Sequence, residues 1–291
     1  MIFGIKLKKK IFLLILIFTL IFLFNNFYNH VNLYISQIVN FDKKDINIQS
    51  YKVQIEAKEF SNIEKNLSGL TYNFLTNTFF AISNRPRNIY ELNKNGDIIR
   101  QIKLSGFKDT EGITHIKNDT FALVDEKKES VIIIKIDSST NHINYEDSKA
   151  IKLEIQNFEN FGFEGVTYNS FKNTILIANE KFPMKIIEIS NWETNNPIFQ
   201  KSEIFENIKQ YVSDISSFTF NEKTNNFIIL SDESKMILEV NQKGKLLSYQ
   251  YLTKGKMYLE NDIPQPEGIT IDKENNIYIV SEPNLFYKFS K

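Results

Sequence analysis

Acidic residues recur at two fixed positions of a repeated pattern in this chain. The first position lies just before a small residue and holds Ser68, Glu111, Glu164, Ser216 and Glu267. The second lies fourteen or fifteen residues after the small residue and holds Asn84, Glu126, Glu180, Asp232 and Glu282. Seven of these ten residues are acidic, whereas 35 Asp and Glu among 291 residues would place about one acid in ten random positions.

Carboxylates that converge on one point suit a hard cation. They would repel one another and raise some of their pKa values unless a cation or basic side chains compensate. The chain has no cysteine and only three histidines, which argues against thiolate and multi-histidine metal centres. Oxygen ligands without His or Cys suit Ca²⁺, which takes roughly 6–8 of them. The predicted calcium ligands are Glu111, Glu126, Glu164, Glu180, Asp232, Glu267 and Glu282.

A second interpretation of the same acids needs no metal. In this interpretation they cap strand ends, stay solvated and pair with basic neighbours, namely Arg85, Arg87, Lys127, Lys181 and Lys235. Other candidate residues are weaker. His115 is either a base or a packed strand residue, and Asp214 either replaces the Glu that is missing before Ser217 or forms a turn. Neither Ser68 nor Ser216 lies in a Gly-x-Ser-x-Gly elbow, which argues against a serine hydrolase.

The acidic positions belong to a repeat of about fifty residues. A small residue, an apolar residue and Thr recur with the small residue at positions 69, 112, 165, 217 and 268, which are 43, 53, 52 and 51 residues apart. Strand-like pieces separated by turn residues follow each motif. In the first unit they are Phe79 to Ser83, Asn88 to Asn93 and Asp97 to Leu104, and in the fourth Phe227 to Ser231, Met236 to Val240 and Lys245 to Leu252.

This repeat predicts an all-β protein with one β-propeller domain over residues 51–291. The propeller has five four-stranded blades, and Tyr51 to Ala57 supplies the strand that the fifth unit lacks and closes the ring. Long inserts in the second and third repeats make six blades the rival count. The first strand of a blade starts at the end where the second strand finishes, so both sets of acids are expected on one face near the axis.

The N-terminal residues predict a membrane anchor. Four lysines up to Lys10 precede Ile11 to Phe24, an apolar run whose only polar member is Thr19. We therefore expect residues 1–28 to form a basic flank and a single-pass anchor that crosses the inner membrane through residues 11–28, with the propeller in the periplasm. A cleaved signal peptide is the alternative, although the small residues of a cleavage site are missing. Residues 29–50 are interpreted as a polar stalk.

Several of these stretches resemble the SdiA-regulated family, also called the YjiK/CarP family. The resemblance rests on Leu-Ser-Gly-Leu-Thr-Tyr (67–72), Leu-Ser-Gly-Phe-Lys-Asp-Thr-Glu-Gly-Ile (104–113), Gly-Phe-Glu-Gly-Val-Thr-Tyr (162–168), Leu-Ser-Asp-Glu-Ser (230–234) and Val-Ser-Glu-Pro-Asn-Leu-Phe-Tyr-Lys-Phe (280–289). It implies a β-propeller outside the inner membrane that is associated with calcium. The family's carboxylate motifs correspond to Glu111, Glu164, Asp232, Glu233, Glu267 and Glu282. The fourth repeat departs from the Glu-Gly pattern, and no settled enzymatic activity accompanies the resemblance.

These observations favour a membrane-anchored, extracytoplasmic calcium-binding propeller. Its expected role is a binding or signalling module in envelope or calcium homeostasis, with an envelope protein or a small anionic ligand as partner. A calcium-dependent hydrolase of phytase or lactonase type is the alternative, and a platform for protein partners without metal is the third hypothesis. The sequence leaves enzymatic activity open. Equal numbers of basic and acidic residues, 35 of each, argue against a nucleic-acid partner.

Overall fold

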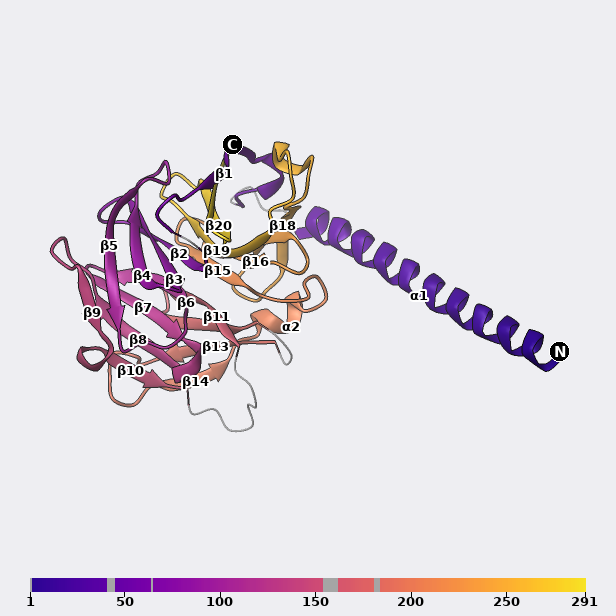
Figure 1. Ribbon diagram of the computed structural model, residues 1–291, viewed down its shortest axis with the longest axis horizontal. Coiled ribbons are helices and arrows are strands. Elements are labelled where there is room, and N and C mark those ends of the chain that lie inside the picture. Colours follow the sequence, from indigo (N-terminus) through magenta and orange to yellow (C-terminus); the bar gives the residue numbers. More distant parts are fainter. Residues whose placement is uncertain (1, 41–44, 64, 154–161, 181–183) are drawn as a thin grey trace.

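The computed structural model describes residues 2–40, 45–63, 65–153, 162–180 and 184–291, and it shows a β-propeller preceded by a long helix (Figure 1). Five sheets follow one another around the ring, so the predicted all-β fold with five four-stranded blades is confirmed. No sixth blade occurs in the part of the chain that the structure describes.

Each blade contains four antiparallel strands, and in blades 1 to 4 all four come from one repeat. Blade 1 contains β2 (Leu67–Asn73), β3 (Thr78–Asn84), β4 (Arg87–Leu92) and β5 (Ile98–Ser105). Blade 2 contains β6 (Thr110–Lys117), β7 (Thr120–Asp125), β8 (Ser130–Lys135) and β10 (Lys149–Lys152). Blade 3 contains β11 (Phe163–Asn169), β12 (Thr174–Asn179), β13 (Lys185–Ser190) and β14 (Ile198–Lys201).

The last two blades follow the same plan. Blade 4 contains β15 (Ser217–Asn221), β16 (Asn226–Ser231), β17 (Met236–Val240) and β18 (Leu246–Tyr251). Blade 5 contains β19 (Gln265–Ile271), β20 (Ile277–Glu282), β21 (Leu285–Ser290) and, from the other end of the domain, β1 (Lys52–Glu59). β1 pairs antiparallel with β21, as the alternation in Tyr51 to Ala57 predicts.

The long inserts predicted from the repeat spacing add elements without adding a blade. β9 (His142–Asn144), in the insert of the second repeat, pairs parallel with β5 and extends blade 1. The helix α2 (Ile204–Ile208) follows blade 3. Short 3-10 turns span Ile48–Ser50, Glu126–Lys128, Tyr145–Asp147 and Lys256–Tyr258.

The hydrophobic core is divided into five clusters, each between two neighbouring blades. In blade 1, Phe80 and Ile82 pack against blade 2, whereas Phe79 and Ala81 pack against blade 5. Successive side chains of a strand point to opposite faces, so a blade that is covered on both faces needs apolar residues at consecutive positions. This explains the continuous apolar runs of the middle strands.

The first strand of each blade forms the inner wall of the propeller, in the order β2, β6, β11, β15, β19 and back to β2. The repeated threonine joins these strands. The hydroxyl of Thr71 accepts the backbone N–H of His115 at 3.0 Å, and that of Thr167 accepts the N–H of Phe220 at 2.9 Å. Thr270 does the same for Tyr72 at 3.0 Å. The threonine recurs in the repeat because its hydroxyl links successive blades.

An asparagine in the left-handed conformation precedes the second strand of every blade. The hairpin between the first two strands contains an Asn with φ between 51° and 66° in all five blades, and asparagine tolerates this conformation better than most residues. These residues are Asn77, Asn118, Asn173, Asn225 and Asn275.

Replacing Thr167 with valine is expected to lower the free energy of unfolding by about 1–3 kcal/mol, because the buried N–H of Phe220 loses its acceptor. Thr219 is the matched control: it occupies the same position in blade 4, and its hydroxyl has no hydrogen bond among the described residues. Urea unfolding of both variants tests this, and equal losses would show that the inter-blade hydrogen bond is not the cause.

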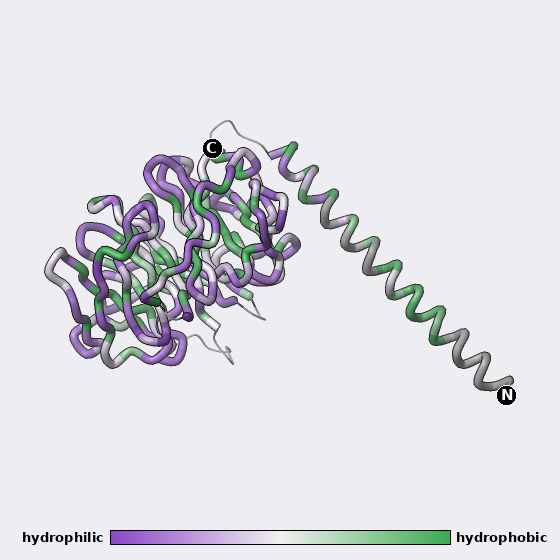
Figure 2. Tube along the Cα trace, turned by 45° about the horizontal axis from the view of Figure 1, so that its top comes forward, coloured by the Kyte–Doolittle hydropathy of each residue, from purple (hydrophilic) through white to green (hydrophobic). Residues whose placement is uncertain are grey.

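The N-terminal region is a single helix, α1 (Ile2–Asn40), so the residues interpreted as the first part of a stalk are helical. Apolar side chains from Ile11 to Ile21 are exposed on all sides of it, and Figure 2 shows its hydrophobic stretches. Over the part of the chain that the structure describes, no helix combines the length and apolar character that a membrane crossing requires.

Candidate cation site

The two sets of predicted acids lie at the same end of the propeller. Glu111, Glu164 and Glu267 occupy early positions of the innermost strands β6, β11 and β19. The acids of the second set lie at the end of the second strand of each blade. Antiparallel pairing places that end beside the start of the first strand; in blade 5, for example, Gln265 pairs with Glu282. The antiparallel geometry anticipated from the repeat therefore holds.

Burial and mutual repulsion act on the acids nearest the axis. Burial, together with the charges of Asp109 and Glu126, raises the pKa of Glu111 to about 7, and hydrogen bonds from Ser68 and Asn84 act in the opposite direction. Because Glu111 is half-buried and lies beside other acids, its carboxyl group is partly protonated near neutral pH.

The same effects act on the other two inner acids. Burial raises the pKa of Glu164 well above its usual range, with Glu180, Glu267 and Glu111 contributing repulsion. Burial, with Asp232 and Glu180 as the largest sources of repulsion, raises the pKa of Glu267 to about 8. The pKa of Glu282 is raised by burial and by Asp232. All seven predicted acids thus belong to one electrostatically coupled group.

The tightest cluster of this group contains a residue that the sequence analysis did not select. One carboxylate oxygen each from Asp109, Glu111 and Glu126 lies within 4.8 Å of the others. Asp109 is buried and precedes Glu111 by two residues, within the 104–113 stretch of the family resemblance. Its spacing to Glu111 matches that of Asp214 to Ser216, so this signal was present in the sequence.

Asp125 fixes the backbone on which this cluster stands. Its fully buried carboxylate accepts the N–H groups of Lys108 at 2.7 Å and of Asp109 and Lys128 at 3.1 Å. The N–H of Glu126 in turn donates to the carbonyl oxygen of Asp109 at 2.8 Å. These bonds tie the loop before β6 to the turn after β7. The acids are therefore held close together by the backbone.

Blade 1 supplies an amide to the cluster. The Nδ2 of Asn84 donates to Oε1 of Glu111 at 2.8 Å, and the Oδ1 of the same amide is buried with no hydrogen-bond partner among the described residues. Carboxylates and an amide oxygen are ligands that Ca²⁺ accepts, and a bound cation would offset the repulsion that raises these pKa values. The donor set therefore fits a hard cation.

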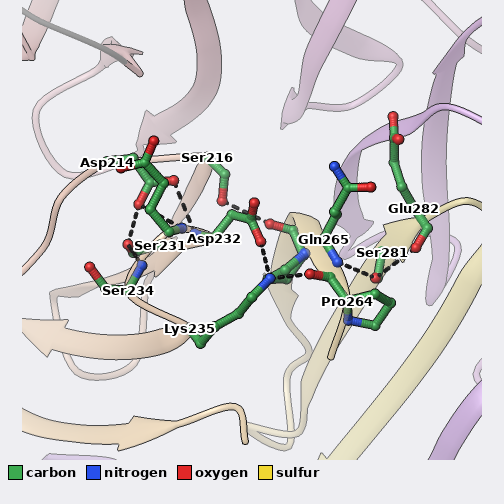
Figure 3. Close-up of polar contacts among 12 residues, drawn as sticks. Asp214, Ser216, Ser231, Asp232, Ser234, Lys235, Pro264, Gln265, Ser281 and Glu282 are labelled. Atoms are coloured by element: carbon green, nitrogen blue, oxygen red, sulfur yellow. Dashed lines mark hydrogen bonds and ion pairs between the residues drawn. The ribbon is translucent and has the colours of Figure 1, made fainter. Parts of the chain in front are cut away.

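Blade 4 completes the acidic end differently. Figure 3 shows Lys235 between the carboxylate of Asp232 and the carbonyl oxygen of Pro264, with an Asp232–Lys235 distance of 2.5 Å. The fully buried Asp214 accepts the N–H groups of Asp232 and Glu233 and the hydroxyl of Ser231. Asp214 therefore stabilises a turn rather than replacing the missing glutamate.

The basic neighbours of the second interpretation pair with only some of these acids. Lys127 forms an ion pair with Asp109, as Lys235 does with Asp232. Arg87 donates to the carbonyl oxygen of Lys108 at 2.9 Å, and Lys181 lies outside the described residues. Glu233, which belongs to the family motif, is exposed. Basic side chains therefore compensate Asp109 and Asp232, whereas Glu111, Glu164 and Glu267 form no ion pair within the part of the chain that the structure describes.

His115 and Trp192 do not contribute to this end. His115 lines a cavity of about 20 Å³ with the five repeated threonines, bonds the carbonyl oxygen of Asn118 at 2.9 Å and has a pKa lowered by burial. Trp192 is buried and packs edge-on against Tyr168, with 6.2 Å between ring centroids. Both are packed residues of the scaffold.

Comparisons with known proteins agree with this architecture. The structure is similar to a glutaminyl cyclase from Myxococcus xanthus, with a TM-score of 0.56, 11% sequence identity and coverage of 82% of this chain and 95% of the other. It also matches a luciferin-regenerating enzyme with a TM-score of 0.48, 11% identity and coverage of 81% and 80%. At such identities the first likeness shows the fold alone. The SdiA-regulated family model matches residues 43–290, so the chain belongs to the SdiA-regulated family.

Proposed function

We propose that the acidic end of the propeller binds Ca²⁺ and that the protein works as a calcium-binding module. The observation that carries this proposal is the cluster of Asp109, Glu111 and Glu126, whose carboxylate oxygens lie within 4.8 Å of one another, with two further half-buried glutamates, Glu164 and Glu267, coupled to it. Such a group is unfavourable by itself and becomes favourable when a cation binds. Asn84 adds an amide whose oxygen has no hydrogen-bond partner in the described part of the chain.

We propose further that α1 anchors the propeller to the inner membrane, on its periplasmic side. The exposed apolar side chains from Ile11 to Ile21 support this, because a helix that is apolar on all sides has no favourable place in water. The lysines that precede them support the orientation. Anchored in this way, the module would report or buffer calcium at the cell envelope through a partner protein or a small anionic ligand.

One observation favours a second function, that of a calcium-dependent hydrolase. Burial and neighbouring acids raise the pKa of Glu111 to about 7, and a carboxyl group that titrates near neutral pH suits general acid–base work. In this second function Asp109 and Glu126 would hold the cation, and Glu111 would be the proton-transfer group beside them instead of a ligand. A cation in this cluster would supply Lewis acidity. Glu111 would then hold or transfer a proton during hydrolysis of a phosphate or carboxylate ester.

Calcium is expected to raise the thermal midpoint of the chelator-treated full chain by about 5–10 °C at a hundredfold excess over the dissociation constant, since binding to the folded state alone contributes about 2.7 kcal/mol. The Glu111→Gln variant should lose most of this shift because it removes one carboxylate from the cluster. Thermal unfolding with Ca²⁺ and with Mg²⁺ measures it.

Glu233→Gln is the matched control, because Glu233 is exposed on the same end of the propeller and should leave the shift unchanged. No shift at millimolar Ca²⁺ in the wild-type chain would contradict the cation site. Turnover of a phosphoester or lactone that needs both Ca²⁺ and Glu111 would favour the hydrolase, and a calcium-selective shift without turnover would favour the binding module.

A further inference from the structure

The C-terminal part of α1 packs on blade 4. Leu33 is only 3% exposed and joins the hydrophobic cluster between blades 3 and 4. Ser36 hydrogen-bonds the Tyr211 hydroxyl at 3.1 Å, and Nδ2 of Asn40 donates to the carbonyl oxygen of Leu246 at 2.9 Å. Residues 33, 36 and 40 lie on one face of a helix. The C-terminal part of α1 therefore contacts the propeller with one face, whereas the apolar stretch before it is exposed on all sides.

The chain beyond the helix continues this contact. Ile46, Ile48 and Tyr51 are buried in the cluster between blades 4 and 5. The N–H of Ile46 donates to Oε1 of Glu239 at 3.0 Å, and the N–H of Ile48 donates to the hydroxyl of Ser248 at 3.1 Å. Ser248 in turn donates to Oε2 of Glu239 at 2.7 Å. The backbone entering the propeller is therefore held by buried polar groups as well as by packing.

Glu239 shows that blade 4 differs from its neighbours at this point. A glutamate occupies the same register position on the third strand of blades 1, 3 and 4, opposite the third residue of the second strand. Glu91 pairs there with Arg100 at 2.6 Å and Glu188 with Lys172 at 3.4 Å. Glu239 forms no ion pair within the described chain and accepts the N–H of Ile46 instead. In blade 4 this carboxylate thus accepts a hydrogen bond from the incoming chain, whereas in blades 1 and 3 it pairs with a basic side chain.

We infer that blade 4 is a docking surface for residues 31–40 and 45–51, so that α1 and the propeller move as one rigid body rather than as a domain on a flexible stalk. The helix rises about 14 Å between Phe24, the last residue of the apolar run, and Leu33. Where α1 enters the bilayer, as proposed above, this geometry holds the propeller beside the membrane in one orientation and gives its acidic end a fixed direction. The orientation rests on the proposed anchor, whereas the docking does not.

Distance measurement between two spin labels tests the docking. The chain has no cysteine, so Tyr28→Cys on α1 and Lys103→Cys on β5 label two exposed sites of the full-length protein. In detergent micelles with chelator, double electron–electron resonance should give a single narrow distance. Leu33→Asp should lose this narrow peak, because it places a charge in the buried contact. Tyr34→Asp, at a neighbouring position that is 61% exposed, should retain it.

A broad distribution in the labelled parent protein would overturn the inference, whatever the variants do. A narrow peak that survives Leu33→Asp in a protein whose circular dichroism shows a folded propeller would overturn it as well. Calcium is absent from these measurements, so their outcome is separate from the cation site. Flotation of the same protein with liposomes reports on membrane association, and failure to float with a narrow distance would refute the anchor while keeping the docking.

Discussion

Replacing Glu267 with glutamine is expected to make the calcium-free protein more stable at pH 8, by about 2–4 kcal/mol in the free energy of unfolding. Burial and repulsion from neighbouring acids raise the pKa of Glu267 from 4.5 to about 8. Between these values the unfolded chain has lost its proton and the folded chain has kept it, so the free energy of unfolding falls as pH rises. Glutamine has a similar shape and no charge to bury.

Urea unfolding with chelator at pH 8 and at pH 4 measures this effect. The stabilisation should be present at pH 8 and vanish at pH 4, where the carboxyl group is protonated in both states of the wild-type chain. Glu203→Gln, at an exposed site, is the control and should change the free energy of unfolding by less than about 0.5 kcal/mol. Equal stability of the wild-type and Glu267→Gln chains at pH 8 would mean that the acid is already compensated.

The sequence predicted the parts of this protein that repeat. Five motifs at regular spacing are enough to place the inner strands, and the common register of the repeats in antiparallel blades is enough to predict that Glu111, Glu164 and Glu267 share one end of the ring. The sequence also predicted strand boundaries: the expected strand Met236 to Val240 has the same bounds as β17. These features were predictable because each depends on contacts within a blade or on the symmetry of the ring.

Features that break the repeat could not be predicted. Asp109 contributes to the cluster because Asp125, sixteen residues later, holds its backbone N–H, and the fourth blade has the same spacing at Asp214 with a different outcome. The pairing of β9 with β5 and the docking of Leu33 on blade 4 depend on residues far apart in the chain. No local pattern encodes such contacts, because they depend on which blade lies next to the inserted segment.

Close packing of the inner strands requires the glycine of the Glu-Gly pattern. The same packing positions the neighbouring glutamates. A Cβ atom on Gly112 would lie 2.3 Å from the carbonyl oxygen of Glu164 and 2.9 Å from Cγ1 of Val166 in the next blade. Gly69 has a corresponding relation to blade 2, since its Cβ would lie 2.7 Å from the carbonyl oxygen of Glu111. The glycine thus lets the inner strands approach, and this approach brings the neighbouring glutamates together.

Gly112→Ala is therefore expected to lower the free energy of unfolding by about 3 kcal/mol or more, because the neighbouring strand cannot retreat without opening the contact between blades 2 and 3. Gly162→Ala is the matched control. Its Cβ would meet nothing closer than 3.7 Å, and its φ lies outside the left-handed region, so its effect should stay within about 1 kcal/mol.

Soluble yield and urea unfolding of both variants measure the difference. Were Gly112→Ala as stable as the control, the inner strands would have room to separate, and the close approach would not be what holds the glutamates together. Calcium titration of any folded Gly112→Ala protein then distinguishes the two roles: a weakened calcium response despite unchanged acids would show that blade spacing itself sets the geometry of the cation site.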